Sequence, residues 1–363
     1  MTSDDIALNR LYNQSIAGSG PQTPAGLVDY MGAMQAQDFA MAKWAIGVRM
    51  PWLTMHDVDA VIDTGEILRT HILRPTWHFV SATVIRPFLK LTAPRILASM
   101  TSRHRQLEID DKLVSRSNKL ITAIILKNGH ATRNELVAAF KNGHIPLDNN
   151  RAAHLLLMAE LGGLICSGKS RGGKPTYALF EERVPRQPVL TREDALALLT
   201  GKFFVSHGPA TIQDFAWWSG LQMKEARQGL QLVSSRLLCE KIGADEYWFA
   251  GDPDRKLTPG HCSLLPAWDE FLVSYKDRTA VLPDMHHKNV VSSNGIFHPV
   301  IVQDGKVIGK WRKIKIKGKL TIGISLFHKV TSGQKKMIYR AVTSLARFHD
   351  LATDIQYGVY SGN

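Results

Sequence analysis

The sequence has few cysteines and no long apolar segment, and each absence excludes a class of protein. Cys166, Cys239 and Cys262 are odd in number and far apart, and none belongs to a C-x-x-C pair. This excludes a disulfide framework and a zinc site, so we expect buried thiols in a reducing cytoplasm. No run of about 18 apolar residues occurs, so no membrane span is expected. The first residues, with Asp4 and Asp5, lack the basic flank and apolar core of a signal peptide.

The sequence has fewer acidic than basic residues, and this imbalance favours a polyanionic binding partner. There are 45 Lys and Arg against 32 Asp and Glu, for a net charge of +13. Each basic side chain that neutralises a phosphate releases a condensed counterion, so such an excess promotes nucleic-acid binding without proving it. A hydrophobic fraction of 44% in 363 residues is enough for about two or three packed domains and excludes a disordered chain.

A plan of three helices and a hairpin is visible in residues 113–190. The expected elements are a helix ending near 126, helices over 133–140 and 149–161, and strands over 164–166 and 176–180. This is the winged helix-turn-helix plan, whose third helix can enter the major groove. The glycine-rich loop between the strands carries Lys169, Arg171 and Lys174 as candidate phosphate contacts.

The same plan recurs twice. In residues 191–258 the expected elements are helices over 194–204, 212–219 and 224–234 and a hairpin of 237–240 with 247–249. A looser copy in residues 1–112 has helices over 25–34 and 39–50 and a hairpin of 67–72 with 77–80. We therefore predict three tandem winged-helix units. Because winged helices also mediate protein contacts, one or two copies with a purely structural role are an alternative.

Residues 259–363 alternate in polarity like strands, apart from a late helix over 332–347. We predict a small β-rich, barrel-like domain there, which makes the fold class α+β. Residues 306–319 hold seven basic residues and no acid. One strand face carries the candidate DNA contacts Lys313, Lys315, Lys317 and Lys319. The alternative is a solvated edge strand that its lysines protect from pairing.

Two other patterns are rejected. Residues 163–170 match the phosphate-loop pattern G-x-x-x-x-G-K-[ST], but that loop needs a strand before it and a helix after it. Here a helix is expected before it, and Gly172, Gly173 and Pro175 follow it, so we interpret it as a wing. No paired metal-ligand spacing occurs among His261, Cys262, His286, His287 and His298. We predict neither a metal nor a cofactor.

Gln35-Ala36-Gln37-Asp38 lies at the junction between two helices of the first unit. Residues two apart do not face each other on a continuous helix, but at a helix start both amides can converge on one point. The alternative is that Asp38 caps the helix beginning at Phe39 and the glutamines are ordinary polar surface.

Met34-Gln35-Ala36-Gln37-Asp38, followed by Ala42-Lys43-Trp44-Ala45, resembles the catalytic stretch of the bacterial winged-helix DNA glycosylases of the AlkZ and YcaQ type. Further matches occur in order along nearly the whole chain: Arg69-Thr70, Thr76-Trp77-His78, His207-Gly208-Pro209-Ala210-Thr211, Asp214-Phe215-Ala216-Trp217-Trp218, Leu264-Leu265-Pro266-Ala267-Trp268-Asp269-Glu270-Phe271, Tyr275-Lys276-Asp277-Arg278, Gly295-Ile296-Phe297-His298-Pro299 and Gly309-Lys310-Trp311-Arg312. The Gln-x-Gln motif is that of the AlkZ type. One departure is that Pro75 and Trp77 flank Thr76 where the family pattern has glycine and leucine.

The resemblance implies a monofunctional glycosylase that excises N7-alkylated purines from double-stranded DNA, with some members unhooking interstrand crosslinks. It implies Gln35 and Gln37 as catalytic residues and Asp38, Trp44, Arg69 and His78 as their neighbours. Further DNA contacts are expected from Lys276, Arg278, His286, His287, Lys288 and Arg312. We expect a monomer without cofactor in the bacterial cytoplasm, associated with the nucleoid. The alternative is a winged-helix transcription regulator without catalysis, or a nucleic-acid scaffold.

Overall fold

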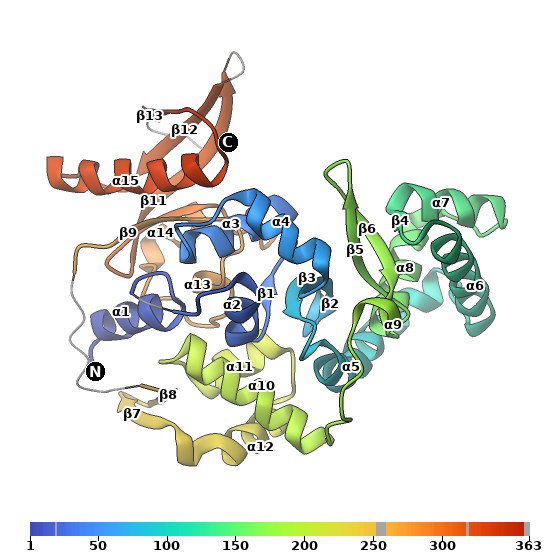
Figure 1. Cartoon of the computed structure of the whole chain (residues 1–363). Coiled ribbons are helices and arrows are strands. Elements are labelled where there is room, and N and C mark those ends of the chain that lie inside the picture. The colour runs from blue at the N-terminus through green and yellow to red at the C-terminus, as the bar shows by residue number, and fades with distance from the viewer. Residues whose placement is uncertain (19, 252–258, 317–318, 359–363) are drawn as a thin grey trace.

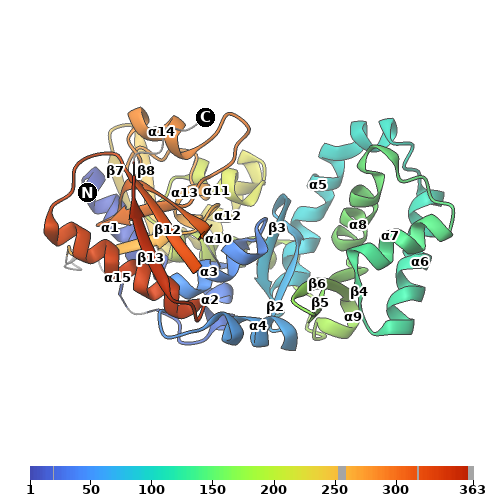
Figure 2. The ribbon, with the colours of Figure 1, turned by 90° about the horizontal axis from the view of Figure 1, so that it is seen from above.

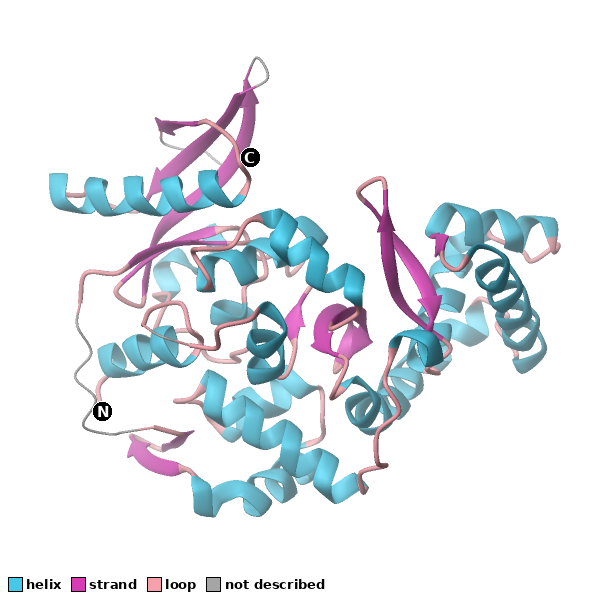
Figure 3. Cartoon of the chain, viewed as in Figure 1, coloured by secondary structure: helices cyan, strands magenta, loops and turns pink. Residues whose placement is uncertain are grey.

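A computed structural model describes the whole chain except residue 19 and residues 252–258, 317–318 and 359–363. Helices and strands are mixed along its length (Figure 3). Residues 24–81 form a three-stranded sheet beside three helices. In chain order the elements are α2 (Pro24–Met31), β1 (Met34–Gln35), α3 (Phe39–Arg49), α4 (Met55–Thr64), β2 (Ile67–Ile72) and β3 (Arg74–Ser81). The sheet order is β1-β3-β2.

Helix α4 was not predicted, although its signals are in the sequence. Thr54 and Asp57 form a capping box at its start, and Val58 and Ile62 are buried on its inner face. With α4, the first segment has the three helices that the looser sequence pattern lacked.

Residues 111–183 repeat this order of elements: α6 (Asp111–Asn128), β4 (Ala131–Thr132), α7 (Arg133–Asn142), η1 (Asp148–Asn150), α8 (Arg151–Leu161), β5 (Ile165–Arg171), β6 (Lys174–Leu179) and α9 (Phe180–Arg183). The sheet order β4-β6-β5 matches that of the first segment. The basic stretch predicted as a loop is mostly strand, because Gly172 and Gly173, both with positive φ, close the hairpin in two residues. The stretch that matches the phosphate-loop pattern therefore follows a helix and continues as a strand, which is the opposite of the order that a phosphate loop needs.

Residues 192–249 have the same order again: α10 (Arg192–His207), α11 (Ile212–Ser219), α12 (Met223–Val233), η2 (Ser234–Arg236), β7 (Leu238–Ile242) and β8 (Asp245–Phe249). An isolated bridge between Ala210 and Trp248 stands where the first strand stands in the other segments. Thr211 begins α11 with a capping box, as Thr132 begins α7.

The C-terminal sheet is open, so the prediction of a barrel was wrong. Its strands are β9 (Cys262–Leu265), β10 (Val300–Gln303), β11 (Lys306–Ile316), β12 (Lys319–Leu326) and β13 (Thr353–Tyr357), in the order β13-β12-β11-β10-β9. The edge strands β9 and β13 do not pair with each other. Helix α15 (Ser332–Phe348) packs Ile338 and Leu345 into one core with Ile322 and Ile324 of β12. That helix supplies the second layer that closure would otherwise provide.

The segment between β9 and β10 is mostly irregular and carries two short helices rather than strands. It contains α13 (Glu270–Val273) and α14 (Asp284–Val290), so His286, His287 and Lys288 lie on a helix. Alternating polarity over a few residues does not separate a short helix from a strand, and that explains the difference.

The first segment lies at the centre of the molecule. One core joins it to α5 (Ile85–Gln106) and to α10 and α11, and another joins it to the C-terminal sheet and α15. Helix α1 (Ser3–Asn13) packs against the C-terminal part. The second segment has its own core and lies at one end, beyond α5 (Figures 1 and 2). None of the described helices combines the length and hydropathy needed to cross a bilayer.

Candidate functional site

The Gln-Ala-Gln motif is the connection between β1 and α3. Gln35 pairs with His78 across the sheet, and the Ala36 N–H donates to the Trp77 carbonyl over 2.7 Å. The strand gives way to a helix at Asp38, whose carboxylate accepts the N–H groups of Ala40 and Met41, both at 3.0 Å. The expected cap is confirmed, and it places Gln37 directly before the N-terminus of α3.

Polar contacts hold the backbone of this connection at almost every group. The Gln35 N–H donates to Glu270 Oε1 over 2.5 Å, and the Gln37 N–H donates to Gln35 Oε1 over 2.9 Å. The Arg69 guanidinium donates to the carbonyls of Ala36 and Gln37 over 2.9 and 3.3 Å. The turn is thus fixed before any substrate binds, which is what positional catalysis requires.

The two glutamine side chains are in different situations. Gln35 is 8% exposed and its carbonyl oxygen is already occupied by the Gln37 N–H. Gln37 is exposed, and its amide has no hydrogen-bond partner in the part of the chain that the structure describes. The Gln37 amide therefore has both its carbonyl oxygen and its NH2 group available to a water molecule or a sugar, whereas the carbonyl oxygen of Gln35 is already engaged.

Glu270 is a buried carboxylate behind the motif. Its Oε2 accepts from Trp218 Nε1 over 3.1 Å and from the Ser274 hydroxyl, and lies 3.6 Å from His207 Nε2. Burial opposes its ionisation, but the charges of His207 and His78 and the Ser274 hydroxyl lower the pKa of Glu270 to about 2. A carboxylate only 1% exposed cannot meet DNA, so it acts by holding β1. Sequence reasoning quoted Glu270 only within a family motif.

His78 and its neighbours on β3 form a polar row. Burial, followed by the charge of Arg74, lowers the pKa of His78 to about 4, so its ring is neutral at pH 7. Alternate residues of a strand share a face, which puts Arg74 and Thr76 on the side of His78 and Gln35. Each member of the row has a buried atom without a partner among the described residues: Arg74 Nε, Thr76 Oγ1 and His78 Nε2. Three such atoms on one face make this row a candidate binding surface. Arg74 was not among the predicted site residues.

The predicted wing contacts lie on β5 and β6. Lys169 and Lys174 are exposed, whereas Arg171 pairs with Glu135 at 2.7 Å and donates to the His130 carbonyl. The wing therefore offers two lysines without a partner in the described structure and one arginine engaged within its own segment.

The predicted contacts after β9 are spread over several surfaces. Lys276 and Lys288 are exposed, and Arg278 donates to the Leu272 carbonyl and lies over the Trp217 ring at 5.7 Å. On α14, His287 is half-buried and the His286 ring stacks on Phe327 at 4.2 Å.

On β11, Arg312 is exposed and Lys313 is half-buried, with its Nζ 2.6 Å from His349 Nε2. The backbones of Lys315 and Lys319 lie in strands, and Lys317 lies outside the described residues.

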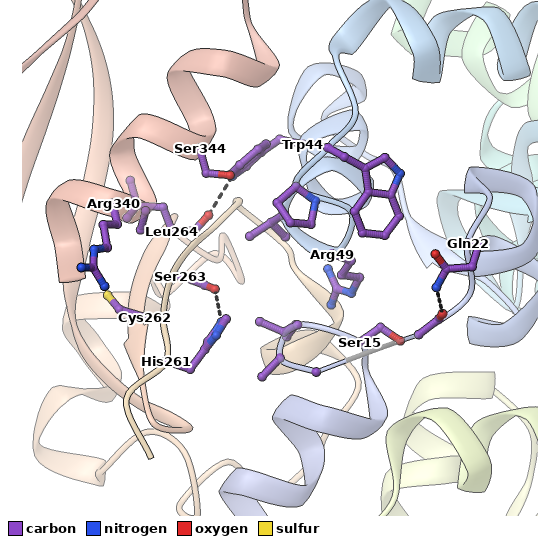
Figure 4. A pocket seen from close by; sticks show the side chains of 18 residues that line it. Ser15, Gln22, Trp44, Arg49, His261, Cys262, Ser263, Leu264, Arg340 and Ser344 are labelled. Atoms are coloured by element: carbon purple, nitrogen blue, oxygen red, sulfur yellow. Dashed lines mark hydrogen bonds between the residues drawn. The ribbon is translucent and has the colours of Figure 1, made fainter. Parts of the chain in front are cut away.

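Trp44, predicted as a neighbour of the motif, belongs to the core. It is 1% exposed, and its indole N–H donates to the Leu264 carbonyl over 2.7 Å. It borders a cavity of about 600 Å³ that neither Gln35 nor Gln37 lines. In Figure 4, Trp44 and Arg49 of α3 face His261 and Ser263, which are joined by a 2.6 Å hydrogen bond.

Comparison with known proteins agrees with this geometry. A family model described as "DNA glycosylase AlkZ-like" matches residues 28–348, most of the chain. The chain belongs to the AlkZ-like DNA glycosylase family. Membership makes it a DNA-repair glycosylase with DNA as its binding partner.

A curated relative and a solved structure, both from Streptomyces sahachiroi, are similar to this AlkZ-like chain. A relative named as an interstrand DNA cross-link repair glycosylase is 23% identical over 319 residues, covering 80% of this chain and 83% of its own. The solved structure of the DNA glycosylase AlkZ matches with a TM-score of 0.80 at 19% identity, covering 99% of this chain and 100% of that one. The likeness of fold extends over the whole molecule, including the open C-terminal sheet.

Proposed function

We propose that this chain hydrolyses the N-glycosidic bond of N7-alkylated purines in double-stranded DNA by direct attack of water. The observation that carries the proposal is the Gln37 amide, which is exposed and has no partner among the described residues, on a turn held by Gln35 and Arg69. The enzyme is monofunctional in this proposal, because the motif offers amides and no amine nucleophile.

Amides suit a cationic leaving base. An N7-alkylguanine already carries positive charge, so its glycosidic bond breaks without a strong acid. What remains is to aim a water at C1′ and stabilise the developing cation on the sugar. A glutamine carbonyl can do both through hydrogen bonding and its negative dipole end, without a titratable proton. Gln37 orients the water. Gln35 fixes the position of Gln37 by accepting a hydrogen bond from the Gln37 backbone N–H. Uncharged bases would be poor substrates for such a site.

We further propose that the three repeated segments are winged helix-turn-helix units. The division is 1–112, 113–190 and 191–258, followed by a C-terminal domain of 259–363. The repeated element order and the two matching sheet orders support this division. The exposed residues Lys169, Lys174, Lys276, Lys288 and Arg312 are proposed to contact phosphates of the alkylated duplex. The protein acts as a monomer in this proposal, since three units in one chain already provide the repetition that dimers usually supply.

The test is excision from a duplex containing one N7-methylguanine, detected by alkaline strand cleavage at the abasic site. We expect Gln37→Ala to lower the single-turnover rate by about 10²- to 10³-fold, as loss of a preorganised electrostatic group does. DNA affinity should stay within about twofold of wild type. Gln228→Ala, at an exposed glutamine of α12 outside the site, is the control. Equal loss in that control would sink the assignment.

The name of the Streptomyces relative suggests a second substrate. A duplex with a nitrogen-mustard crosslink between N7 atoms would show whether this chain also unhooks crosslinks. Wild-type activity on neither lesion, with tight binding to one DNA sequence, would instead favour a transcription regulator.

A further inference from the structure

Two adjoining cavities lie between the first and second segments, apart from the row of Gln35 and His78. Their volumes are about 240 and 350 Å³, and both are lined by Trp77, Arg133 and Tyr177. The hairpins β2–β3 and β5–β6 lie side by side at this place (Figure 2). Together the cavities reach the size of a typical small-ligand site, which is about 300–1,000 Å³.

One wall of this space is rigid before anything binds. The Trp77 indole N–H donates to the buried Glu160 carboxylate over 3.3 Å. The His71 ring lies 4.3 Å from the Trp77 ring, and the Arg69 guanidinium lies over it at 4.4 Å. The Glu160 carboxylate is itself held in place, because it also accepts the backbone N–H of His71 and contacts the ring Nδ1 of His71.

The opposite wall is unsatisfied. Among the described residues, neither the Tyr177 hydroxyl nor the Arg133 guanidinium has a hydrogen-bond or ion-pair partner. Burial raises the pKa of Tyr177 well above its ordinary value, so its hydroxyl remains a donor. Two donors thus face a space that is also lined by the aromatic and apolar residues Trp77, Phe39 and Pro175 and by the polar residues Arg69, Glu160 and Ser170.

The space is connected to the candidate catalytic turn. Trp77 follows Thr76 and precedes His78 on β3, so its side chain lies on the sheet face opposite theirs. Arg69 lines the 240 Å³ cavity and also donates to the carbonyls of Ala36 and Gln37. A group in the cavity would therefore touch the same guanidinium that holds Gln37.

The net charge of the residues that line the cavity indicates which kind of ligand it favours. Arg69 and Arg133 contribute two positive charges against the one negative charge of Glu160. This balance disfavours the cationic lesion purine itself and favours a neutral ring with acceptor atoms. We propose that the cavity receives a planar aromatic ring delivered by the bound DNA, with acceptor atoms toward Arg133 and Tyr177. The proposal rests on the proposed function, and the ring has two sources: an aromatic substituent on the lesion, or a base of the partner strand.

The test uses the full chain and four duplexes. N7-methylguanine or N7-(4-nitrobenzyl)guanine is placed opposite cytosine or an abasic-site analogue, so the substituent ring and the partner base are offered separately. Kd and the single-turnover excision rate are measured for each duplex. We expect wild type to bind a duplex that offers a ring about fivefold to a hundredfold more tightly than the duplex that offers none, as aromatic stacking does.

Tyr177→Ala and Arg133→Gln should abolish that preference, and Tyr177→Phe should keep part of it. Arg133 is exposed, so Arg133→Gln leaves the fold intact. Arg236→Gln removes the same charge at an exposed residue outside the cavity and should leave the preference unchanged. A preference that follows the nitrobenzyl group identifies the lesion substituent, and one that follows cytosine identifies the partner base.

The proposal is overturned if wild type shows no preference for a ring, or if Tyr177→Ala and Arg133→Gln weaken all four duplexes equally. The binding comparison holds whether or not a base is excised. Retained ring preference with no excision from any duplex would contradict the proposed function alone.

Discussion

At the scale of single residues, the proposed mechanism gives the two glutamines of the motif different roles. Gln35 uses its carbonyl oxygen on the Gln37 N–H, so its contribution depends on an acceptor at that atom. We expect Gln35→Glu, which keeps the acceptor, to retain at least tenfold more excision activity than Gln35→Met, which has the length but no acceptor. Single-turnover rates on N7-methylguanine DNA would measure this. Equal activity of the two variants would show that the contact does not matter.

The neutral His78 ring predicts a pH-dependent stability. Its folded pKa of about 4 is below the ordinary 6.5, so the unfolded chain binds the proton first as the pH falls. Stability that is fully present above pH 6.5 is therefore lost between pH 6.5 and 4, by about 2–3 kcal/mol at pH 4.5. Urea unfolding at pH 7 and 4.5 should show a smaller loss for His78→Gln. An unchanged pH dependence in that variant would contradict the assignment.

At the scale of elements, α3 is joined to the segment before α13 by a buried ion pair. Arg49 donates to both Asp269 oxygens at 2.8 and 2.9 Å, and both side chains are fully buried. Asp269→Asn would leave the guanidinium uncompensated, and we expect a loss of about 3–5 kcal/mol in unfolding free energy. Asp59→Asn, which breaks the more exposed pair with Lys43, should cost under about 1 kcal/mol. Thermal and urea unfolding of the two variants would compare them.

The wing makes a prediction about salt. If Lys169 and Lys174 each neutralise one phosphate, replacing both with glutamine should reduce the slope of log Kd against log salt by about two. Lys127→Gln, at an exposed lysine of α6, is the control and should leave the slope unchanged. Binding titrations of a 20-base-pair duplex at several salt concentrations would measure this slope. An unaltered slope would place the DNA elsewhere.

Sequence patterns predicted elements best where caps and apolar periodicity agree. Helix α11 was expected over 212–219 and occurs there, since Thr211 and Asp214 mark its start and Gly220 ends it. Helix α5 was missed because Pro94, inside it, argues against a helix of 22 residues. The barrel was predicted from alternation alone, which cannot show that α15 covers the sheet instead.

The sequence predicted only those parts of the candidate site whose residues are close together along the chain. Gln35, Gln37 and the Asp38 cap are close in sequence, and a family resemblance marks them. Glu270 is 235 residues from Gln35, and its contact is with a backbone N–H, which no residue pattern records. The unpartnered atoms of Arg74 and Thr76 are likewise visible only once β3 is packed.

At the scale of the whole molecule, the first segment shares cores with the third segment and with the C-terminal sheet. The second segment has a core of its own, and its residues Leu157, Leu161, Cys166 and Phe180 also join the core shared by the first and third segments. The candidate catalytic turn thus lies within the larger body, and the second segment packs against the first beside the Trp77 cavities. Helix α5 lies between the first segment and the second segment (Figure 2).

The length of α5 sets a footprint on DNA. At 1.5 Å per residue, its 22 residues measure about 33 Å, which equals the rise of about ten base pairs. We therefore predict that a duplex lying along α5 contacts the protein over about one helical turn beyond the lesion. N7-methylguanine four base pairs from a blunt end should be excised several-fold more slowly on one side than the same lesion in the middle of a 30-mer. The slow side would reveal the direction in which the enzyme lies along the strand.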